Sequence, residues 1–361
     1  MPGFFCAASS RIDAGVRAER VASIVMPDSV LVTGGAGFVG SHIVVELARS
    51  GYAPVVLDNF TNSTPAIRTR LEALAGRPVP CVTVDVRDVA ALRSAFHDHP
   101  ITAVVHCAGL KNVAESQARP LAYYDVNVGG TLGLIEVMGE AGVATLVYAS
   151  SASVYGDIDD VVVAEDATRN PASVYGRTKV VVEDFLRDLS QANANWRIAI
   201  VRRFNVAGAH SSGMMGDAPR GRSTHLIPQL CRVAAGEAGE VIVHGDDWDT
   251  PDGTGVRDYV HVQDLAAGFV RALAHVASRP GLVAVNLGSG TSHSVLAVLA
   301  AFERACGRTI ARVIGPRRPG DIAGASADIA RAAELLDWRP TRDLDAICAD
   351  AWRWQKNGGR Y

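Results

Sequence analysis

The chain has 361 residues, of which 48% are hydrophobic and 20% charged, and its formal net charge is −3 at pH 7. This balance is typical of a soluble globular protein, and the length suits one large domain or two closely packed ones. The absence of clustered lysines and arginines excludes a nucleic-acid-binding surface, and no apolar run reaches the roughly 18 residues needed to span a membrane.

The first 27 residues do not form a secretory signal, because charged residues such as Arg11 and Glu19 interrupt their short apolar stretches. We expect residues 1–27 to be a disordered or loosely docked extension, and Met26 is an alternative start. The cysteines are scattered without a paired or metal-binding motif, which favours free thiols, a cytoplasmic location and no metal site. They are Cys6, Cys81, Cys107, Cys231, Cys306 and Cys348.

Short apolar strands alternate with helical patterns through the first 204 residues. Strands are expected at residues 30–33, 55–57, 82–84, 103–106, 146–148 and 198–201. Helices are expected at residues 39–50, 88–99, 121–141 and 173–193. Unbroken apolar strands separated by helices are typical of a parallel sheet covered on both faces. We therefore predict an α/β fold, with a doubly wound Rossmann domain over residues 28–204.

After about residue 204 the alternation weakens, and loops rich in Gly, Asp and Pro interrupt the helical segments. Those segments lie near residues 224–236, 262–277, 294–305, 328–336 and 343–356. We expect residues 205–357 to form mainly a smaller, mixed α/β domain for the substrate, with the chain crossing between the two halves.

A glycine loop between the first strand and the first helix points to a dinucleotide site. Gly34, Gly37 and Gly40 permit a tight turn, approach to a pyrophosphate and close packing of the helix. Asp58, at the tip of the next strand, can bind ribose hydroxyls and would repel a 2′-phosphate, which favours NAD over NADP. The alternative is a plain strand–turn–helix with a capping aspartate. Asp85, after the third strand, could reach the adenine or be an ordinary loop acid.

Tyr175 and Lys179 stand four residues apart in a predicted helix and therefore share a face. A neighbouring cation lowers a tyrosine pKa from its usual value of about 10, so the phenol can serve as a base. Ser151 follows the fifth strand, at the edge where such sheets bind ligands, and can hydrogen-bond the reacting oxygen. The alternatives are an exposed Tyr–Lys contact and a polar serine turn.

Six further segments are distinctive, and they lie at residues 57–63, 106–111, 123–127, 203–209, 252–261 and 317–321. Together with the glycine loop and the Tyr–Lys pair, they make residues 29–357 resemble the extended short-chain dehydrogenase/reductase family. Within that family, the chain is most similar to the UDP-galactose (UDP-glucose) 4-epimerases. The resemblance implies inversion of C4 of a UDP-hexose through a transient 4-keto sugar, by a homodimer with tightly bound NAD.

The resemblance also implies roles for individual residues. Tyr175 would be the catalytic base, Lys179 its partner, and Ser151 a second hydroxyl at the sugar. The cofactor would be lined by Gly34, Gly37, Phe38, Val39, Asp58, Asn59, Asn62, Asp85, Val86, Lys111, Asn127, Lys179 and Phe204. The UDP-sugar would be bound by Ser151, Tyr175, Asn205, Leu226, His244, Arg257, Arg318, Asp321 and Ala325. Guanidinium groups suit a diphosphate, although each arginine could equally be a solvated surface charge.

Four positions depart from the family pattern. Arg203 stands where Tyr is usual, His225 where Asn commonly touches the substrate, and His244 where an aromatic ring commonly stacks on the uracil. Ala325 stands where some members carry a bulky Tyr beside the sugar. Because a small residue leaves room at the C2 substituent, we hypothesise that N-acetylated UDP-hexoses are also substrates.

Related 4,6-dehydratases and decarboxylases typically place acidic residues just after the serine, whereas this chain has Ala152 and Ser153. This difference argues against both reactions. Epimerisation of UDP-glucuronate or of a UDP-pentose stays open. So does a non-catalytic NAD-binding regulatory or scaffold protein, which would need only the glycine loop.

Overall fold

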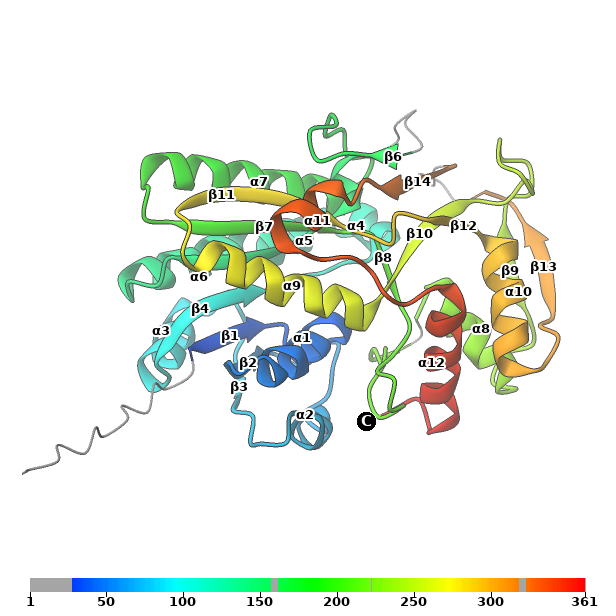
Figure 1. The fold of residues 1–361 in the computed structure, drawn as a ribbon, viewed down its shortest axis with the longest axis horizontal. Coiled ribbons are helices and arrows are strands. Elements are labelled where there is room, and N and C mark those ends of the chain that lie inside the picture. The colour runs from blue at the N-terminus through cyan, green and yellow to red at the C-terminus, as the bar shows by residue number, and fades with distance from the viewer. Residues whose placement is uncertain (1–27, 157–161, 222, 318–322, 361) are drawn as a thin grey trace, which may run out of the picture.

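A computed structural model describes residues 28–156, 162–221, 223–317 and 323–360; the predicted extension over residues 1–27 lies outside these ranges. The largest element is a seven-stranded parallel sheet between two layers of helices (Figure 1). Its strands are β1 (Ser29–Thr33), β2 (Ala53–Asp58), β3 (Cys81–Thr83), β4 (Ile101–His106), β5 (Thr145–Ser151), β7 (Arg197–Arg203) and β11 (Gly281–Leu287).

The strands of this sheet follow the order β11-β7-β5-β4-β1-β2-β3. The order therefore reverses between β1 and β4, with later strands added on opposite sides of β1. In a doubly wound sheet, ligands bind beyond the carboxyl ends of the strands at this reversal. The predicted α/β fold with a doubly wound sheet is confirmed.

Alternating side chains fill both faces of the sheet. Along β1, Val30 and Val32 join one hydrophobic core and Leu31 joins the other. The first core is covered by α1 (Phe38–Arg49), α2 (Ile67–Ala75), α9 (Val262–Ala277) and α11 (Ala330–Leu336). The second is covered by α3 (Val89–Asp98), α6 (Gly130–Glu140) and α7 (Val174–Ala192). Burial on both faces explains why these strands read as unbroken apolar runs.

The helix predicted over residues 121–141 is interrupted. It consists of α5 (Pro120–Tyr124), a π-helical turn η1 (Asp125–Gly129) and α6. Such a turn often lies at a functional site, and Asn127 lies within this one. Two helices were not predicted, namely α2 and α4 (Val113–Ala118). Six residues are too few for helical periodicity to identify α4.

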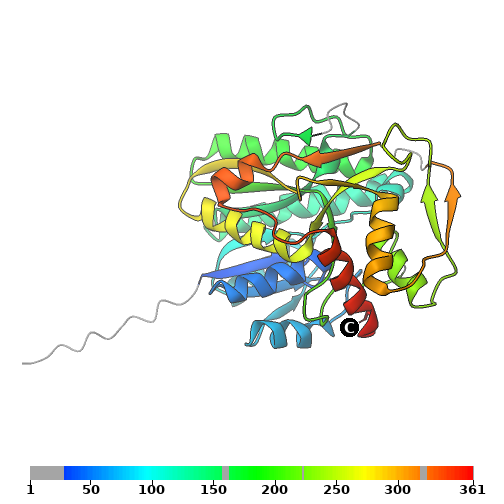
Figure 2. The ribbon, with the colours of Figure 1, turned by 45° about the vertical axis from the view of Figure 1, so that its right-hand side comes forward.

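Most of the later segments lie beside the carboxyl ends of the main sheet (Figures 1 and 2). A second sheet contains β6 (Val162–Val163), β8 (Asn205–Ala207), β10 (Val256–His261), β12 (Ser292–Ser294) and β14 (Gly324–Ala327). A parallel pair, β9 (Val241–His244) and β13 (Arg312–Gly315), lies furthest from the main sheet in Figure 2. A third core joins α8 (Leu226–Ala234), α10 (Val295–Cys306) and α12 (Leu344–Lys356).

The chain also returns to the first half after residue 204. Helix α9 packs against α1, and β11 pairs with β7 along its whole length. Strand β11 was not predicted, because its apolar run stands apart from the alternating pattern that identified the other six strands.

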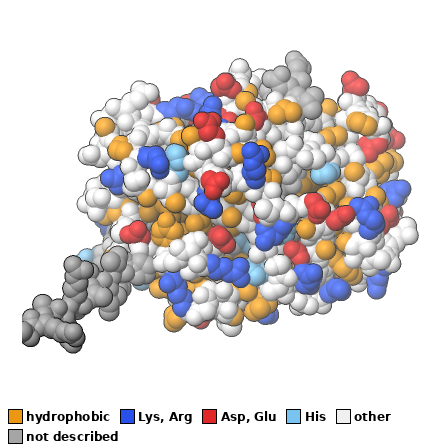
Figure 3. Space-filling model, viewed as in Figure 1, with side chains coloured by type: hydrophobic (Ala, Val, Ile, Leu, Met, Phe, Trp, Pro, Cys, Tyr) orange, Lys and Arg blue, Asp and Glu red, His pale blue; other side chains and the backbone are white. Residues whose placement is uncertain are grey.

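Charged side chains of both signs are interspersed over the face shown in Figure 3. Within the described ranges, no helix is both long and apolar enough to cross a bilayer. Those ranges also contain no cluster of three or more His, Cys, Asp or Glu side chains arranged to bind a metal ion.

Candidate active site

The loop between β1 and α1 brings the backbone very close to its neighbours. Gly34 has φ +67°, a conformation that favours glycine, and a Cβ there would lie 2.7 Å from the Ala108 nitrogen. A Cβ on Gly40 would lie 2.2 Å from the Gly34 oxygen. The Gly37 N–H donates to that same oxygen at 3.0 Å. Gly37 is also the residue that precedes the first turn of α1. The loop is therefore a tight cradle whose N–H groups and helix N-terminus favour an anion.

The Asp58 carboxylate ends β2 and is fixed beside this cradle. It accepts hydrogen bonds from the Ala36 N–H at 3.1 Å, the Phe60 N–H at 2.8 Å and the Ser63 hydroxyl at 3.0 Å. Two carboxylate oxygens have about four acceptor sites, so capacity remains for a ligand hydroxyl.

A second cluster of polar side chains lies next to Asp58. The Asn59 amide donates to the Asp85 carboxylate at 2.8 Å, and the Arg87 guanidinium binds the same carboxylate at 2.8 Å. The hydrogen bonds from Arg87 hold the pKa of Asp85 well below its usual range. Val86, which stands between Asp85 and Arg87 in the chain, is buried. Asn59 therefore links the Asp85 carboxylate to the loop that carries Asp58.

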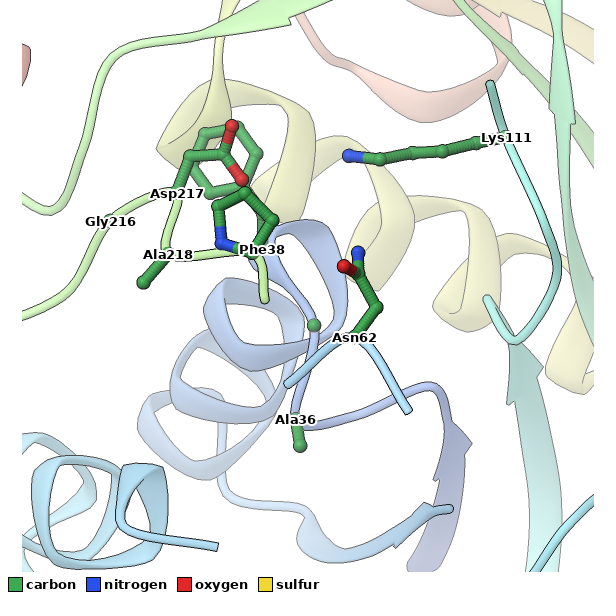
Figure 4. Close-up of a pocket in the computed structure, with 9 residues that line it drawn as sticks. Ala36, Phe38, Asn62, Lys111, Gly216, Asp217 and Ala218 are labelled. Carbon is green, nitrogen blue, oxygen red and sulfur yellow. The ribbon is translucent and has the colours of Figure 1, made fainter. Parts of the chain in front are cut away.

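A small pocket lies over the glycine loop (Figure 4). On one side, the Lys111 ammonium and the Asn62 amide point into it; the Phe38 ring and residues 216–219 lie on the other. Residues 216–219 were not predicted as part of the site, because a contact between distant segments leaves no local sequence pattern.

Asn127 organises the loop that follows β4. Its oxygen accepts from the Leu110 N–H at 2.8 Å, and its amide donates to the Leu110 oxygen at 3.0 Å and to the Thr178 hydroxyl at 3.1 Å. This buried side chain thus ties the loop to α7. Val39 packs against the first core, and Phe204 is buried directly after β7.

Tyr175 lies in the first turn of α7 and is only 4% exposed. The Ser173 hydroxyl caps this helix, and the Ser116 hydroxyl accepts from the Tyr175 N–H at 3.2 Å. Lys179 lies one turn further on, 5% exposed, and its ammonium donates to the Ala149 oxygen at 2.9 Å. Because both side chains are buried, the alternative of an exposed Tyr–Lys contact is excluded.

The surroundings favour the deprotonated form of the phenol. Burial raises the pKa of Tyr175. The cations of Arg203 and Lys179 and a hydrogen bond from Ser151 lower it by a larger amount, so the pKa falls below its ordinary value of 10. Burial lowers the pKa of Lys179. The Arg203 Nη2 lies 3.3 Å from the phenol oxygen. The predicted fall in pKa is therefore present, with an unpredicted contribution from Arg203.

Ser151 ends β5 and is paired in register with Arg203 of β7. Its hydroxyl oxygen accepts from the Ser153 N–H at 3.2 Å and caps a short 3₁₀ turn, η2 (Ala152–Val154). Ser151 therefore belongs to a polar turn and also hydrogen-bonds the Tyr175 phenol. The structure brings the three predicted catalytic residues together at one edge of the sheet.

The predicted UDP-binding residues come from several elements of the second half. Arg257 of β10 and Ala325 of β14 are paired in register. Asn205 begins β8, Leu226 begins α8 and His244 ends β9. Arg318 and Asp321 lie outside the described residues.

The loop after β9 carries an aromatic group that the sequence did not identify. The Arg317 guanidinium stacks 3.9 Å from the centre of the Trp248 ring and binds Asp247 at 2.7 Å. The Trp248 N–H donates to the His244 oxygen at 3.4 Å, and the His244 ring hydrogen-bonds the Pro316 oxygen at 3.1 Å. The Trp248 ring is therefore joined to the His244 backbone and has the Arg317 guanidinium stacked on it.

The family model described as the NAD dependent epimerase/dehydratase family matches residues 30–288, and the chain belongs to this family. A UDP-glucose 4-epimerase from Yersinia pestis is 48% identical over 334 residues, which cover 92% of this chain and 99% of that protein. The resemblance predicted from the sequence motifs is confirmed.

Solved structures agree with this assignment. A UDP-glucose 4-epimerase from Stenotrophomonas maltophila, with bound NAD and formylated UDP-arabinopyranose, has a TM-score of 0.90 at 44% identity. Another, from Bifidobacterium longum in complex with NAD+ and UDP, has a TM-score of 0.89 at 43% identity. In both comparisons the match covers 92% of this chain and 99% of the other.

Proposed function

We propose that this chain is an NAD-dependent epimerase that interconverts UDP-glucose and UDP-galactose by inverting C4. The observation that carries the proposal is the buried Tyr175 phenol, which lies between Ser151 and the cations of Lys179 and Arg203 at the ligand-binding edge. Identity of 48% to a UDP-glucose 4-epimerase over nearly the whole chain supports the same reaction. A scaffold protein would not need this arrangement.

The residues around the glycine loop fit NAD. Gly34 and Gly40 leave no room for a side chain against the neighbouring backbone, as the tight turn and close helix packing of a dinucleotide-binding loop require. The fixed Asp58 carboxylate suits ribose hydroxyls and disfavours a 2′-phosphate. Lys111 and Asn62 would complete the site from the pocket above. When bound there, NAD would supply the reversible hydride acceptance that oxidation and reduction at C4 of the sugar require.

The chain's own residues handle the proton. The Tyr175 phenolate takes the proton of the sugar 4-hydroxyl, and the Ser151 hydroxyl hydrogen-bonds the same oxygen. Tyr175 gives the proton back when C4 is reduced, so each turnover restores the phenolate. Lys179 stabilises the phenolate through its positive charge.

The second half would hold the nucleotide while the 4-keto sugar turns. We propose that residues 205–357 bind UDP, so that binding energy at the nucleotide retains the sugar intermediate. The proposed ligands are Asn205, Leu226, His244, Arg257, Arg318 and Asp321. Ala325, whose backbone pairs with Arg257, would leave space for an N-acetyl group at C2.

Incubation of the purified protein with UDP-galactose, UDP-N-acetylgalactosamine and UDP-glucuronate, followed by separation of the products, tests this function. We expect UDP-glucose from the first, UDP-N-acetylglucosamine from the second, and no conversion by Tyr175→Phe. Full activity of Tyr175→Phe would refute the role as base. Conversion of UDP-glucuronate alone would replace the proposed substrate, and no conversion of any sugar would favour the scaffold alternative.

We further propose a homodimer formed through the helices on one side of the main sheet. Most of the exposed large apolar side chains within the described ranges lie there, namely Val113, Leu121, Tyr124, Leu132 and Val181 on α4 to α7. Leu121 is 83% exposed. Leu121→Glu should give a monomer by sedimentation, whereas Ile242→Glu on β9 should leave the mass unchanged. A native monomer would contradict the proposal.

We also propose a cytoplasmic location. Five cysteines lie in the described ranges and all five are free thiols, which suits a reducing compartment. Fractionation of the source cells with an antibody to the chain tests this proposal, and enrichment outside the cytoplasm would contradict it.

A further inference from the structure

The end of strand β7 places a second cation at the reactive phenol. Arg203 is the last residue of β7 and is paired in register with Ser151 on one side and Leu287 on the other. Neighbouring strands therefore hold its backbone from both sides. Its Nη2 lies 3.3 Å from the Tyr175 oxygen, which is within hydrogen-bond distance.

The adjacent arginine is a contrasting case. Arg202 points into the second core, where its guanidinium forms two hydrogen bonds with the Glu183 carboxylate, at 3.0 and 2.7 Å. Its charge is thereby neutralised. For Arg203, the described residues provide no carboxylate within ion-pair distance. Its positive charge therefore interacts with the phenol and is not neutralised by a neighbouring carboxylate.

We propose that Arg203 is a positioning residue that orients the Tyr175 hydroxyl and, together with Lys179, stabilises its deprotonated form. The proposal rests on the proposed epimerase function only for its consequence in turnover. The proton balance is unchanged: Tyr175 still takes and returns one proton, and Arg203 keeps all of its own. An opposite charge at this distance lowers a pKa by about one to three.

Several other groups face the phenol. Lys179 lies on the same helix, Ser151 on β5, and Lys111 on the loop after β4. The Tyr123 and Tyr148 hydroxyls also lie close enough to interact with the phenol, and burial raises the pKa of each, so both stay neutral. Among the groups that lower the pKa of Tyr175, Arg203 and Lys179 act most strongly.

The test measures the ionisation of Tyr175 directly. The tyrosinate absorbance of each protein, minus that of the same protein carrying Tyr175→Phe, gives the pKa of this phenol without any turnover. We expect Arg203→Gln to raise that pKa by about one or more, and Arg203→Lys to restore most of the difference. Arg203→Tyr introduces the neutral residue usual at this position, so it provides a second test that is compatible with the fold.

The matched control is Arg177→Gln, which removes an exposed arginine from the turn of α7 that also carries Tyr175. It should leave the pKa of Tyr175 unchanged. In UDP-galactose turnover, Arg203→Gln and Arg203→Tyr should move the acid limb of kcat/KM upward by about one pH unit. That shift corresponds to a roughly tenfold loss on the acid side, with the alkaline plateau retained.

The outcomes separate this proposal from the proposed function. An unchanged Tyr175 titration in both neutral variants, with epimerisation by the native protein, would overturn the role of Arg203 alone. A raised pKa without turnover of any UDP-sugar by the native protein would support Arg203 and overturn the function instead. Equal loss of activity at every pH, with unchanged titration, would mark Arg203 as merely structural.

Discussion

Single glycines decide how closely α1 approaches β1. Gly40 lies in the first turn of α1, where a methyl group would overlap the Gly34 carbonyl at 2.2 Å. Gly139 lies in the last turn of α6, and a Cβ atom added to it would have no neighbour within 4 Å. The two glycines therefore have opposite consequences for the same substitution.

Gly40→Ala should lose thermal stability and bound NAD, because α1 must move away from the loop that we propose cradles the cofactor. Forcing extra atoms into a packed contact destabilises a protein by about 1–3 kcal/mol. Gly139→Ala should be neutral or stabilising by up to about 1 kcal/mol, since alanine restricts the unfolded chain. Thermal unfolding and the NAD content of the purified variants measure both effects. Full NAD content in Gly40→Ala would contradict this account of the loop.

Glycine spacing and the Tyr–Lys spacing are local patterns, so the sequence alone could identify those residues as candidates for the site. The contact between Arg203 and Tyr175 could not be predicted in that way. It depends on the register that pairs β7 with β5 and on the position of α7 above them. The sequence showed only that Arg203 departs from the usual tyrosine.

At the scale of elements, a buried polar network joins α7 to the middle of the sheet. Glu183 of α7 is fully buried and accepts from Arg202 of β7 and from Ser150 of β5 at 2.6 Å. Arg202 also donates to the Tyr155 hydroxyl at 2.9 Å, which in turn donates to Asn286 of β11. This network fixes the helix that carries Tyr175 and Lys179.

Glu183→Gln should lower the free energy of unfolding by about 3–5 kcal/mol, because it leaves the buried Arg202 cation without a counter-charge. Urea unfolding of the NAD-loaded protein measures this difference. The control is Glu136→Gln, which breaks an exposed pair with Arg93 and should change the free energy by less than about 1 kcal/mol. Equal effects of the two substitutions would contradict the importance of the buried pair.

Six strands of the main sheet were predictable because each is an apolar run next to a helical pattern. Strand β11 was not, because its place beside β7 is set by a return of the chain after residue 204. Helix α4 was missed because six residues show no periodicity. The π-helical turn η1 was missed because its side chains fit an ordinary helix pattern.

At the scale of the whole molecule, buried histidines link stability to pH. Burial lowers the pKa of His42 and of His106 to about 3, and that of His210 to about 4. In the unfolded chain these groups titrate near 6.5. Below that pH the unfolded state binds more protons than the folded state, so stability falls as the pH is lowered from about 6.5 towards 3.

His42→Gln should therefore flatten the pH dependence of the unfolding free energy between pH 6.5 and about 4.5, by up to about 1.4 kcal/mol per pH unit. Parallel urea titrations of the native protein and the variant provide the comparison. His97→Gln changes an exposed histidine on α3 and should keep the native slope. An unaltered slope in His42→Gln would show that this histidine does not stay neutral when buried.

The most direct test of the account follows a deuterium atom placed at C4 of UDP-galactose through complete epimerisation by the NAD-loaded protein. If the hydride removed from C4 is returned to the same carbon within a closed site, the UDP-glucose formed will carry the deuterium at C4. Loss of the label to solvent hydrogen, detected by proton magnetic resonance of the product, would contradict oxidation and reduction at C4 with retention of the sugar.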